Sequence, residues 1–305
     1  MNYEAFKRSL LAALRAQAGE EVSFYTEPVP KNNGIIKEGL ILRKKGSSVV
    51  PAVFLEDMYE HMDGQPVDYE DLAERLLAIC CEETAWIDKQ LTDFHDFAKA
   101  SEHIYARVIN AELNEKQLTR VPHENILDLA IVCYYVLENE KQDGAGTVLI
   151  DNRILEYWGI PGEQLLALGK ANTAKKIPAS LFHIDDLIRL LEEERYMQYA
   201  PALTEDEKLP LYVMTNTEKY YGAYALFYPG LQRHVADVLN TSFYILPSSI
   251  HETILVPDSG QYTPHELQEI VKSANRTVVE RKEFLSDSVY YYDRDTCMLS
   301  VVAKG

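Results

Sequence analysis

The sequence contains no run of about 20 consecutive apolar residues, the length that a helix needs to cross a membrane. Near its start, Lys7, Arg8 and Arg15 interrupt the apolar positions, and no basic segment precedes an apolar core as it does in a secretory signal. The first stretch therefore predicts an amphipathic helix of a mature protein. We expect a bacterial, cytoplasmic location and no membrane partner.

Cysteine is scarce. The four cysteines, Cys80, Cys81, Cys133 and Cys297, show no CxxC spacing of the kind that zinc sites use. All four lie within apolar periodic stretches, which predicts buried, reduced thiols and neither disulfides nor a zinc site. We expect no metal and no cofactor.

Positive charge is also in short supply. The chain has 30 Lys and Arg against 48 Asp and Glu, a formal net charge of -18. Such a balance repels phosphate backbones and anionic lipid head groups. The basic triplet from Arg43 to Lys45 fits a short turn. No nucleic-acid partner is expected. The simpler interpretation of the acidic residues is that they keep the protein soluble and do not form a functional site.

Several motifs that carry a known mechanism are missing. The sequence has no GxxxxGK[ST] loop, no GxGxxG after a strand and no DxDxDG loop, which argues against the common nucleotide and calcium sites. It also has no GxSxG nucleophile elbow and no HExxH helix. The usual hydrolase and zinc-protease signatures are therefore absent.

What is present predicts a folded α+β protein. With 305 residues and 47% hydrophobic residues, the chain suffices for one large or two ordinary domains. We expect a largely antiparallel sheet built from hairpin-helix units with flanking helices. The apolar pattern lapses from Ala98 to Glu102, which predicts an α-β-β-β-α-α segment over residues 1–98 and a larger α+β domain over residues 99–305.

Hydrophobic periodicity and turn residues locate the expected elements. In the first segment, we expect helices at Tyr3–Gln17, at Leu55–Met62 and from Asp68 or Tyr69 onward, with strands at Val22–Val29, Ile35–Arg43 and Ser48–Phe54. In the second, we expect strands at Ile104–Ile109, Ile126–Val136 and Thr147–Ile150, helices at Gly162–Asn172 and Ile184–Glu194, a linker at Tyr199–Pro210, and a final hairpin of Ser288–Tyr292 with Cys297–Ala303.

Two stretches, Leu211–Gly230 and Phe243–Gly260, share one pattern. Each has an aromatic and β-branched run, a polar break, and a second run that a Pro and a following Gly end, which predicts two β-hairpins. Helices are expected directly after them, at Leu231–Leu239 and His265–Asn275. The T-I-L-V segment at Thr253 and a similar T-V-L-I segment at Thr147 each precede a helix-like stretch, which fits either an internal duplication or a shared structural demand.

The best catalytic candidate is the segment P-S-S-I-H-E with the aspartate that follows it. Ser249, His251, Glu252 and Asp258 could supply a nucleophile, a base and an orienting group, or metal ligands. His123, just before an expected strand, could join them. Against this hypothesis, successive strand residues face opposite sides of a sheet, and serines are common in hairpin turns.

Aromatic residues provide the binding candidates. The chain has 20 tyrosines, whose rings offer contact area together with a polar group. Tyr220 and Tyr224 are expected on one face of a strand, opposite Tyr221. Tyr290 and Tyr292, in the run Y-Y-Y-D-R-D, could bind a peptide or a sugar by stacking. The simpler alternative for that run is a strand followed by a charged turn.

Several stretches resemble those of a known family. They are K-N-N-G-I-I-K-E-G-L-I-L-R (Lys31–Arg43), V-F-L-E-D-M-Y-E-H-M (Val53–Met62), I-L-D-L-A-I-V-C-Y-Y-V-L (Ile126–Leu137), L-P-L-Y-V-M-T-N (Leu209–Asn216), Y-I-L-P-S-S-I-H-E (Tyr244–Glu252) and S-D-S-V-Y-Y-Y-D (Ser286–Asp293). Over nearly the whole chain, the sequence resembles a family carried as a domain of unknown function, common in gut clostridia and often present as several paralogues. The resemblance implies no activity, cofactor or catalytic residue.

The sequence leaves three hypotheses open. The leading one is a soluble, non-catalytic binding or regulatory protein that engages a peptide or protein partner through an exposed sheet or groove with tyrosines. The alternative is a hydrolase or metal-dependent enzyme centred on Ser249, His251 and Glu252. A third, a defence or mobile-element component, follows only from the paralogues of the resembling family. The oligomeric state stays open.

Overall fold

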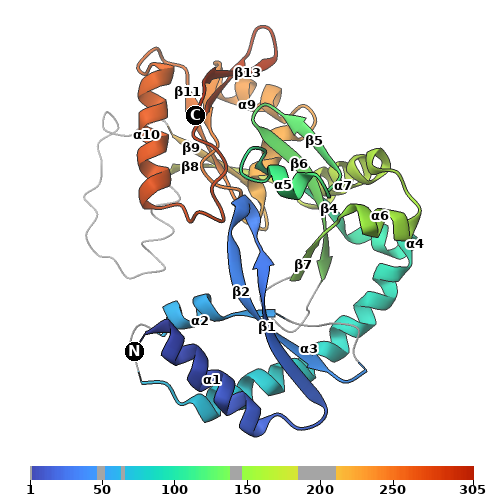
Figure 1. Cartoon of the computed structure of the whole chain (residues 1–305). Helices are drawn as coiled ribbons and strands as arrows, with labels where there is room; N and C mark the ends of the chain where they lie inside the picture. The colour runs from blue at the N-terminus through green and yellow to red at the C-terminus, as the bar shows by residue number, and fades with distance from the viewer. Residues whose placement is uncertain (1, 47–51, 63–65, 138–145, 185–210) are drawn as a thin grey trace. The chain divides into compact units, whose positions relative to one another are not determined.

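The computed structural model describes residues 2–46, 52–62, 66–137, 146–184 and 211–305 (Figure 1), with the backbone alone between 79 and 91. Contacts divide the chain into two compact units. The N-terminal unit comprises Met1–His103 with Leu137–Gly146, and the C-terminal unit comprises Ile104–Val136 with Thr147–Gly305. The division into domains 1–98 and 99–305 stays a prediction.

The N-terminal unit combines helices with a three-stranded antiparallel sheet in the order β1-β2-β3. Its elements are α1 (Tyr3–Gln17), β1 (Val22–Pro30), the 3₁₀ turn η1 (Asn32–Gly34), β2 (Ile36–Lys44), β3 (Ala52–Phe54), α2 (Leu55–His61), α3 (Tyr69–His95), α4 (Phe97–Ala100) and η2 (Ser101–His103). The helices and strands predicted for this region are confirmed, apart from residues 48–51 of the third strand, which lie outside the described residues.

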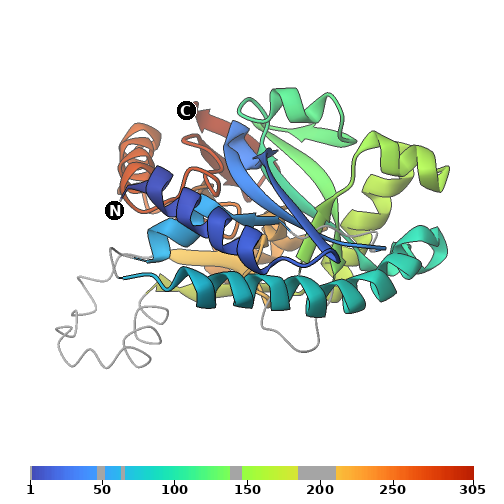
Figure 2. The same cartoon turned by 60° about the horizontal axis from the view of Figure 1, so that its bottom comes forward.

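Helix α1 is part of the core of this unit. Asn2 caps it, its side chain accepting a hydrogen bond from the Ala5 amide. Phe6, Leu10 and Leu14 recur at helical spacing and are fully buried. They form one apolar cluster with residues of β2, α2 and α3, and α1 packs beside α3 (Figure 2). The amphipathic pattern of the first stretch therefore serves packing.

The C-terminal unit contains two antiparallel sheets. One has the order β4-β6-β5 with β7 also paired to β6, and the other has the order β13-β12-β10-β11-β9-β8. The elements are β4 (Ile104–Asn110), α5 (Glu115–Leu118), β5 (His123–Ile126), β6 (Leu129–Leu137), β7 (Gly146–Leu149), α6 (Asn152–Trp158), α7 (Gly162–Lys176), β8 (Ala179–His183), β9 (Tyr212–Asn216), η4 (Gly222–Phe227), α9 (Leu231–Leu239), β10 (Phe243–Leu246), β11 (Thr253–Pro257), α10 (Pro264–Thr277), β12 (Val289–Asp293) and β13 (Met298–Ala303). This arrangement confirms the predicted α+β class and its antiparallel sheets.

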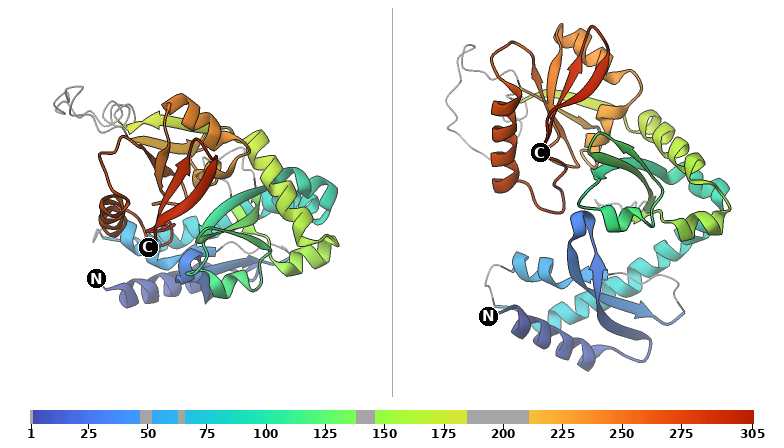
Figure 3. Two further views of the ribbon diagram at one scale, coloured as in Figure 1. Left: turned by 90° about the horizontal axis from the view of Figure 1, so that it is seen from above. Right: turned by 45° about the horizontal axis from the view of Figure 1, so that its top comes forward.

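Helices cover each sheet of this unit. Helix α7 packs closely on β4, where the Thr173 hydroxyl accepts a hydrogen bond from the Ala106 amide at 2.7 Å. Helix α10 packs against β10, β12 and β13 (Figure 3), and its buried Leu267 and Val271 join Val289 in one cluster. A capping box formed by Thr263 and Glu266 starts α10.

One carboxylate ties the two sheets together. Asp128, between β5 and β6, accepts hydrogen bonds from the hydroxyls of Ser286 at 2.6 Å and Ser288 at 2.8 Å, and from that of Tyr290. Burial and the Asp128 charge raise the pKa of Tyr290, so its phenol stays protonated. Tyr290 therefore has a structural bond in the sheet.

Several predicted elements differ from the structure. The second strand expected in Leu211–Gly230 is wrong: Tyr220 and Tyr221 lie in a turn, and Gly222–Phe227 form the 3₁₀ helix η4, so this stretch is not a hairpin. Phe243–Gly260 is confirmed as one, through the β10–β11 pair. The single strand expected at Ile126–Val136 is divided between β5, which ends at Ile126, and β6, which begins at Leu129. The chain turns between them at Leu127, which has φ 57.

Helix α7, helices α9 and α10 and the final hairpin are confirmed. The predicted duplication stays a prediction: β7 and β11 both follow a strand to which they pair, and both precede a helix. Apart from Ile184, the helix expected at Ile184–Glu194 and the linker at Tyr199–Pro210 lie outside the described residues.

The side chains of two cysteines, Cys133 and Cys297, are described. The predicted burial is confirmed for Cys133 and wrong for Cys297. Cys133 is fully buried in β6, and burial raises the pKa of its thiol to about 12. Cys297 is exposed, because it sits in the turn between β12 and β13 with φ 57. Cys80 and Cys81 lie where the side chains are not described.

Candidate functional site

The turn after β9 presents two adjacent tyrosines, Tyr220 and Tyr221. The side chain of Asn216 holds this turn: its amide nitrogen donates to the Tyr220 carbonyl at 2.9 Å, and its oxygen accepts from the Tyr220 amide at 3.3 Å. Lys219 and Tyr221 adopt left-handed backbone conformations with φ 52 and 53. The two rings therefore project from a backbone that side-chain hydrogen bonds fix locally.

A close backbone approach at Gly222 places this turn against the loop between β10 and β11. A Cβ atom at Gly222 would clash with the Thr215 hydroxyl and lie 2.5 Å from the His251 carbonyl and 2.7 Å from the Asn216 amide. The Thr215 hydroxyl also donates a hydrogen bond to the His251 carbonyl at 2.8 Å. Only glycine fits here, so the sequence Y-Y-G dictates the contact.

The loop that carries His251 is paired with a third segment. The Ile250 amide donates to the Glu283 carbonyl at 2.8 Å, and the Leu285 amide donates to the Ser248 carbonyl at 3.0 Å. These bonds bring the Glu283 side chain next to His251, with 3.8 Å between its carboxylate and Nε2 of the ring. Three segments far apart in the chain thus meet at one histidine.

The His251 ring is held as a neutral acceptor. Its Nδ1 accepts a hydrogen bond from the Tyr221 amide at 3.2 Å, which puts the ring proton on Nε2. Burial lowers the pKa of His251, the positive charges of Lys282 and Arg107 act in the same direction, and Glu283 opposes them. The ring lies parallel to that of Tyr221, with 5.7 Å between centroids.

An arginine completes the group from the other sheet. Arg107 lies in β4, and its guanidinium carbon is 4.4 Å from the ring centroid of Tyr221 and 5.6 Å from that of Tyr134. Its Nε is buried, and no oxygen or nitrogen of the described residues accepts a hydrogen bond from this atom. Tyr134 meets Tyr221 edge to face, at 5.0 Å.

Tyr220 forms the outer part of the group. Its side chain is 44% exposed, whereas Tyr221 is 8% exposed. Its hydroxyl donates to the Tyr221 hydroxyl at 2.9 Å, and burial together with Tyr221 raises the pKa of Tyr220. We call Arg107, Tyr134, Tyr220, Tyr221 and His251 the Tyr220 cluster. It offers one aromatic ring at the surface, packed on Tyr221, whose own ring contacts the Arg107 cation.

The predicted catalytic residues only partly converge. The Ser249 hydroxyl accepts from the His251 amide at 3.0 Å, while the ring bonds elsewhere, so the hydroxyl and the imidazole are not paired. Glu252 reaches solvent, although desolvation and the Glu283 charge raise its pKa. His123 Nδ1 donates to the Val121 carbonyl at 2.9 Å, and Asp258 accepts from the Tyr291 hydroxyl at 2.8 Å.

The predicted binding tyrosines lie in four different settings. Tyr220 is in the cluster. Tyr224 is buried in η4 beside Tyr228, so its expected sharing of a strand face with Tyr220 is wrong. Tyr290 is bonded to Asp128, and Tyr292 is buried with its ring stacked on Phe243 at 5.4 Å.

Sequence reasoning missed Arg107 and Tyr134, which belong to the Tyr220 cluster, and Glu283, which lies beside it. The signal for Arg107 was available, because it is the only charged residue in the apolar strand Ile104–Asn110. A charged side chain at such a position needs a partner or a special environment. Tyr134 and Glu283 carry no comparable signal.

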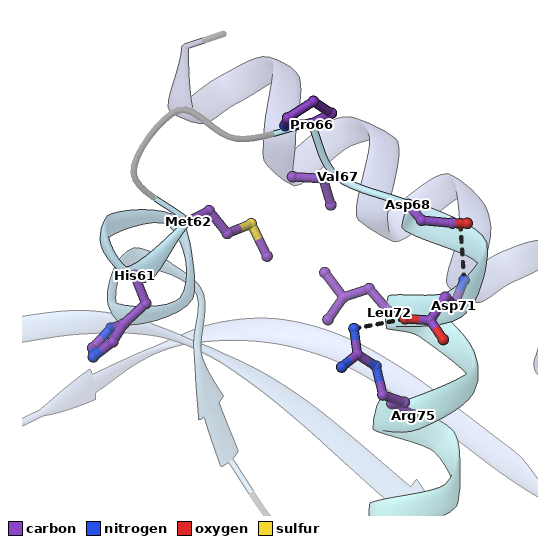
Figure 4. A pocket seen from close by; sticks show the side chains of 8 residues that line it. All are labelled: His61, Met62, Pro66, Val67, Asp68, Asp71, Leu72 and Arg75. Atoms are coloured by element: carbon purple, nitrogen blue, oxygen red, sulfur yellow. Dashed lines mark hydrogen bonds and ion pairs between the residues drawn. The ribbon is translucent and has the colours of Figure 1, made fainter.

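The N-terminal unit has a shallow hollow of about 410 Å³ where α2 ends and α3 begins (Figure 4). Met62, Val67 and Leu72 give it apolar walls. Its charged groups are satisfied within α3, where Asp71 pairs with Arg75 at 2.6 Å and Asp68 accepts from the Asp71 amide at 3.1 Å. None of the predicted site residues lies in this hollow.

Among the residues that the structure describes, no three His, Cys, Asp or Glu side chains are grouped so that they could hold a metal ion. Within the same residues, no helix combines the length and the apolar character that spanning a membrane requires.

The fold and the cluster define an antiparallel α+β protein with an aromatic and cationic surface group. The chain belongs to a family of unknown function, DUF5688, whose model matches residues 3–294. This confirms the resemblance to a domain of unknown function over nearly the whole chain. Neither the curated proteins nor the solved structures contain a match.

Proposed function

We propose that this chain is a non-catalytic binding protein that engages a peptide or protein partner through the Tyr220 cluster. The observation that carries the proposal is the position of Arg107, stacked on Tyr221 with a buried Nε that has no acceptor among the described residues. Beside it, the half-exposed Tyr220 ring supplies apolar area and a hydroxyl.

The chemistry of the cluster supports a partner surface. Tyrosine and arginine are enriched among the residues that dominate protein interfaces, because they combine large contact area with directional polar groups. The cluster is also held in place, since Asn216 fixes the turn and His251 accepts from the Tyr221 amide. A preformed surface loses less side-chain entropy when a partner binds.

The catalytic alternative, centred on Ser249, His251 and Glu252, stays a prediction with less support. A serine nucleophile needs a base within hydrogen-bond reach of its hydroxyl. Here Nδ1 of His251 is occupied by the Tyr221 amide, Nε2 faces Glu283, and the Ser249 hydroxyl bonds to a backbone amide. Catalysis would require these groups to exchange partners first.

The remaining expectations belong to the same proposal. We propose a bacterial, cytoplasmic protein that binds neither nucleic acid nor membranes. The net charge of -18 supports this, because it opposes contact with anionic polymers and lipid surfaces. The packing of α1 supports it as well, since Phe6, Leu10 and Leu14 are buried inside the N-terminal unit.

The test is affinity capture with matched baits. The wild type, Tyr220→Ala and Tyr157→Ala are immobilised at equal density and exposed to lysate of the source cells. Tyr157 is the control because its side chain is 61% exposed on α6 and outside the cluster. We expect a stoichiometric partner on the wild type and on Tyr157→Ala, and binding of the purified partner about 30-fold weaker with Tyr220→Ala.

Two results would contradict the proposal. One is the absence of any stoichiometric partner on the wild-type bait. The other is a partner that Tyr220→Ala binds as tightly as the wild type does, which would place its contact surface away from the cluster.

A further inference from the structure

We propose that the Arg107 guanidinium is the receptor for a carboxylate group that the partner presents beside the Tyr220 ring. This rests on the proposed function in taking the Tyr220 cluster as the partner surface, and it adds the chemical group that is recognised. Three features carry it: the missing acceptor, the way the guanidinium is held, and the balance of charge around it.

Among the cations that the structure describes, Arg107 alone has a buried donor atom without an acceptor. Lys7, Lys37 and Arg153 each pair with a carboxylate, as expected where 48 acidic residues surround 30 basic ones. The side chain of Arg107 makes no ion pair and no hydrogen bond with any described residue, and its Nε is out of contact with solvent. A buried donor on a charged group without an acceptor is unfavourable. The two Nη atoms of the same guanidinium are not among the buried atoms that lack a partner, so the ligand would reach the group from this end.

The guanidinium lies against two aromatic rings. The rings of Tyr221 and Tyr134 lie against it at 4.4 and 5.6 Å, and β4 is fixed by its pairing with β6, where Arg107 lies opposite Val132. A cation–π contact uses none of the N–H hydrogen bonds of the group, which stay available for an acceptor. A carboxylate can accept two parallel bonds from such an edge.

The surrounding charge favours a carboxylate over a phosphate. Glu283 lies 3.8 Å from His251, and its charge also raises the pKa of Glu252, so two carboxyl groups border the cluster. Lys282, the other cation that acts on His251, already pairs with Glu280 at 2.8 Å and with Glu283 at 3.9 Å. A phosphate dianion would meet more repulsion here than a planar monoanion does.

The experiment uses the wild-type chain and small probes, so it needs no partner. Sodium acetate is titrated at constant ionic strength while NMR follows the Nε–H resonance of Arg107 and the imidazole of His251. We expect a saturable shift of Nε–H with a dissociation constant on the order of 10 mM. We also expect the pKa of His251 to rise, because the bound anion offsets the charge of Arg107.

Variants and further probes sharpen the result. Arg107→Lys keeps the charge but loses the planar fork, so acetate should bind at least about tenfold more weakly. Arg153→Lys, at an exposed arginine paired with Asp151 on α6, is the matched control and should bind as the wild type does. N-acetylglycine and the α-amide of N-acetylglutamate distinguish a chain-terminal carboxylate from a side-chain one.

Several outcomes would overturn the inference. The first is no saturable shift of the Arg107 resonance with acetate up to about 100 mM, ten times the expected dissociation constant. The second is an unchanged affinity for acetate in Arg107→Lys. The third is tighter binding of inorganic phosphate than of acetate. If acetate binds at Arg107 but no partner is captured, the proposed function falls and the carboxylate site stands. If binding of a partner depends on Tyr220 while acetate has no effect on Arg107, the proposed function stands and the carboxylate site falls.

Discussion

The backbone amide of Tyr221 donates a hydrogen bond to Nδ1 of His251 at 3.2 Å, and the two rings lie within 7° of parallel. This bond joins the turn after β9 to the loop between β10 and β11, 30 residues apart. Because Nδ1 is the acceptor, Nε2 carries the proton and faces Glu283. The first role of His251 is therefore to position the Tyr220 cluster.

We predict that His251→Phe destabilises the protein. Phenylalanine keeps an aromatic ring near Tyr221 but removes the acceptor, so the Tyr221 amide would lose its partner in a half-buried place. An unsatisfied donor of this kind costs about 1–3 kcal/mol. Urea unfolding measures the change in the free energy of unfolding. His265→Phe, at an exposed position on α10, is the control and should change it by less than about 0.5 kcal/mol.

The lowered pKa of His251 predicts a pH dependence of stability. Because the pKa is lower in the folded chain than the unfolded value near 6.5, the unfolded state binds more protons between the two values. The free energy of unfolding should therefore be at its full value above about pH 6.5 and fall as the pH drops toward the folded pKa. The difference between the wild type and His251→Gln isolates this slope.

That comparison has its own control. Glu252 has a raised pKa, which gives a slope of opposite sign at lower pH, but this contribution is common to the wild type and His251→Gln. Urea unfolding from about pH 5 to pH 8 covers the histidine range. A pH slope that is equal in the two proteins would refute the assignment of the neutral ring to His251.

Gly222→Ala should disrupt the site most severely. The new Cβ atom would lie 2.5 Å from the His251 carbonyl and 2.7 Å from the Asn216 amide, both backbone atoms that cannot move aside. We expect a loss of about 3 kcal/mol or more in the free energy of unfolding. Gly19→Ala is the matched control, because a Cβ there meets nothing within 4 Å. Equal stability of the two variants would contradict the close approach.

Much of the fold could be predicted because local patterns agree with the tertiary structure. Helix α1 follows from apolar residues at helical spacing and an Asn cap, and the β10–β11 hairpin follows from two β-branched runs around a turn. The prediction failed at Tyr220–Phe227. Aromatic residues there favour a strand by propensity, but Gly222 packs against β9, and the chain forms η4.

The candidate site was harder to predict because its members come from four segments: β4, β6, the turn after β9 and the loop between β10 and β11. His251 and Tyr220 could be selected by residue type alone, but nothing in the sequence places them 5.2 Å apart. Their meeting depends on the pairing of β9 with β11 and on the left-handed turn at Lys219 and Tyr221. Arg107 could have been selected as a charged residue in an apolar strand. Nothing in the sequence indicates that its guanidinium contacts the rings of Tyr134 and Tyr221.

Cys297 should be the more reactive of the two cysteines whose side chains are described. Its thiol accepts a hydrogen bond from Nη1 of Arg233 at 2.9 Å, and this bond, followed by one with Tyr292, lowers its pKa, whereas burial holds the pKa of Cys133 near 12. At pH 7, iodoacetamide should label Cys297 rapidly and leave Cys133 unmodified in the folded chain, as read by peptide mass spectrometry. Arg233→Gln should slow the labelling of Cys297 several-fold because it removes the charge that stabilises the thiolate, while Arg276→Gln on α10 should leave it unchanged. Equal labelling rates in the two variants would show that Arg233 does not control the thiol.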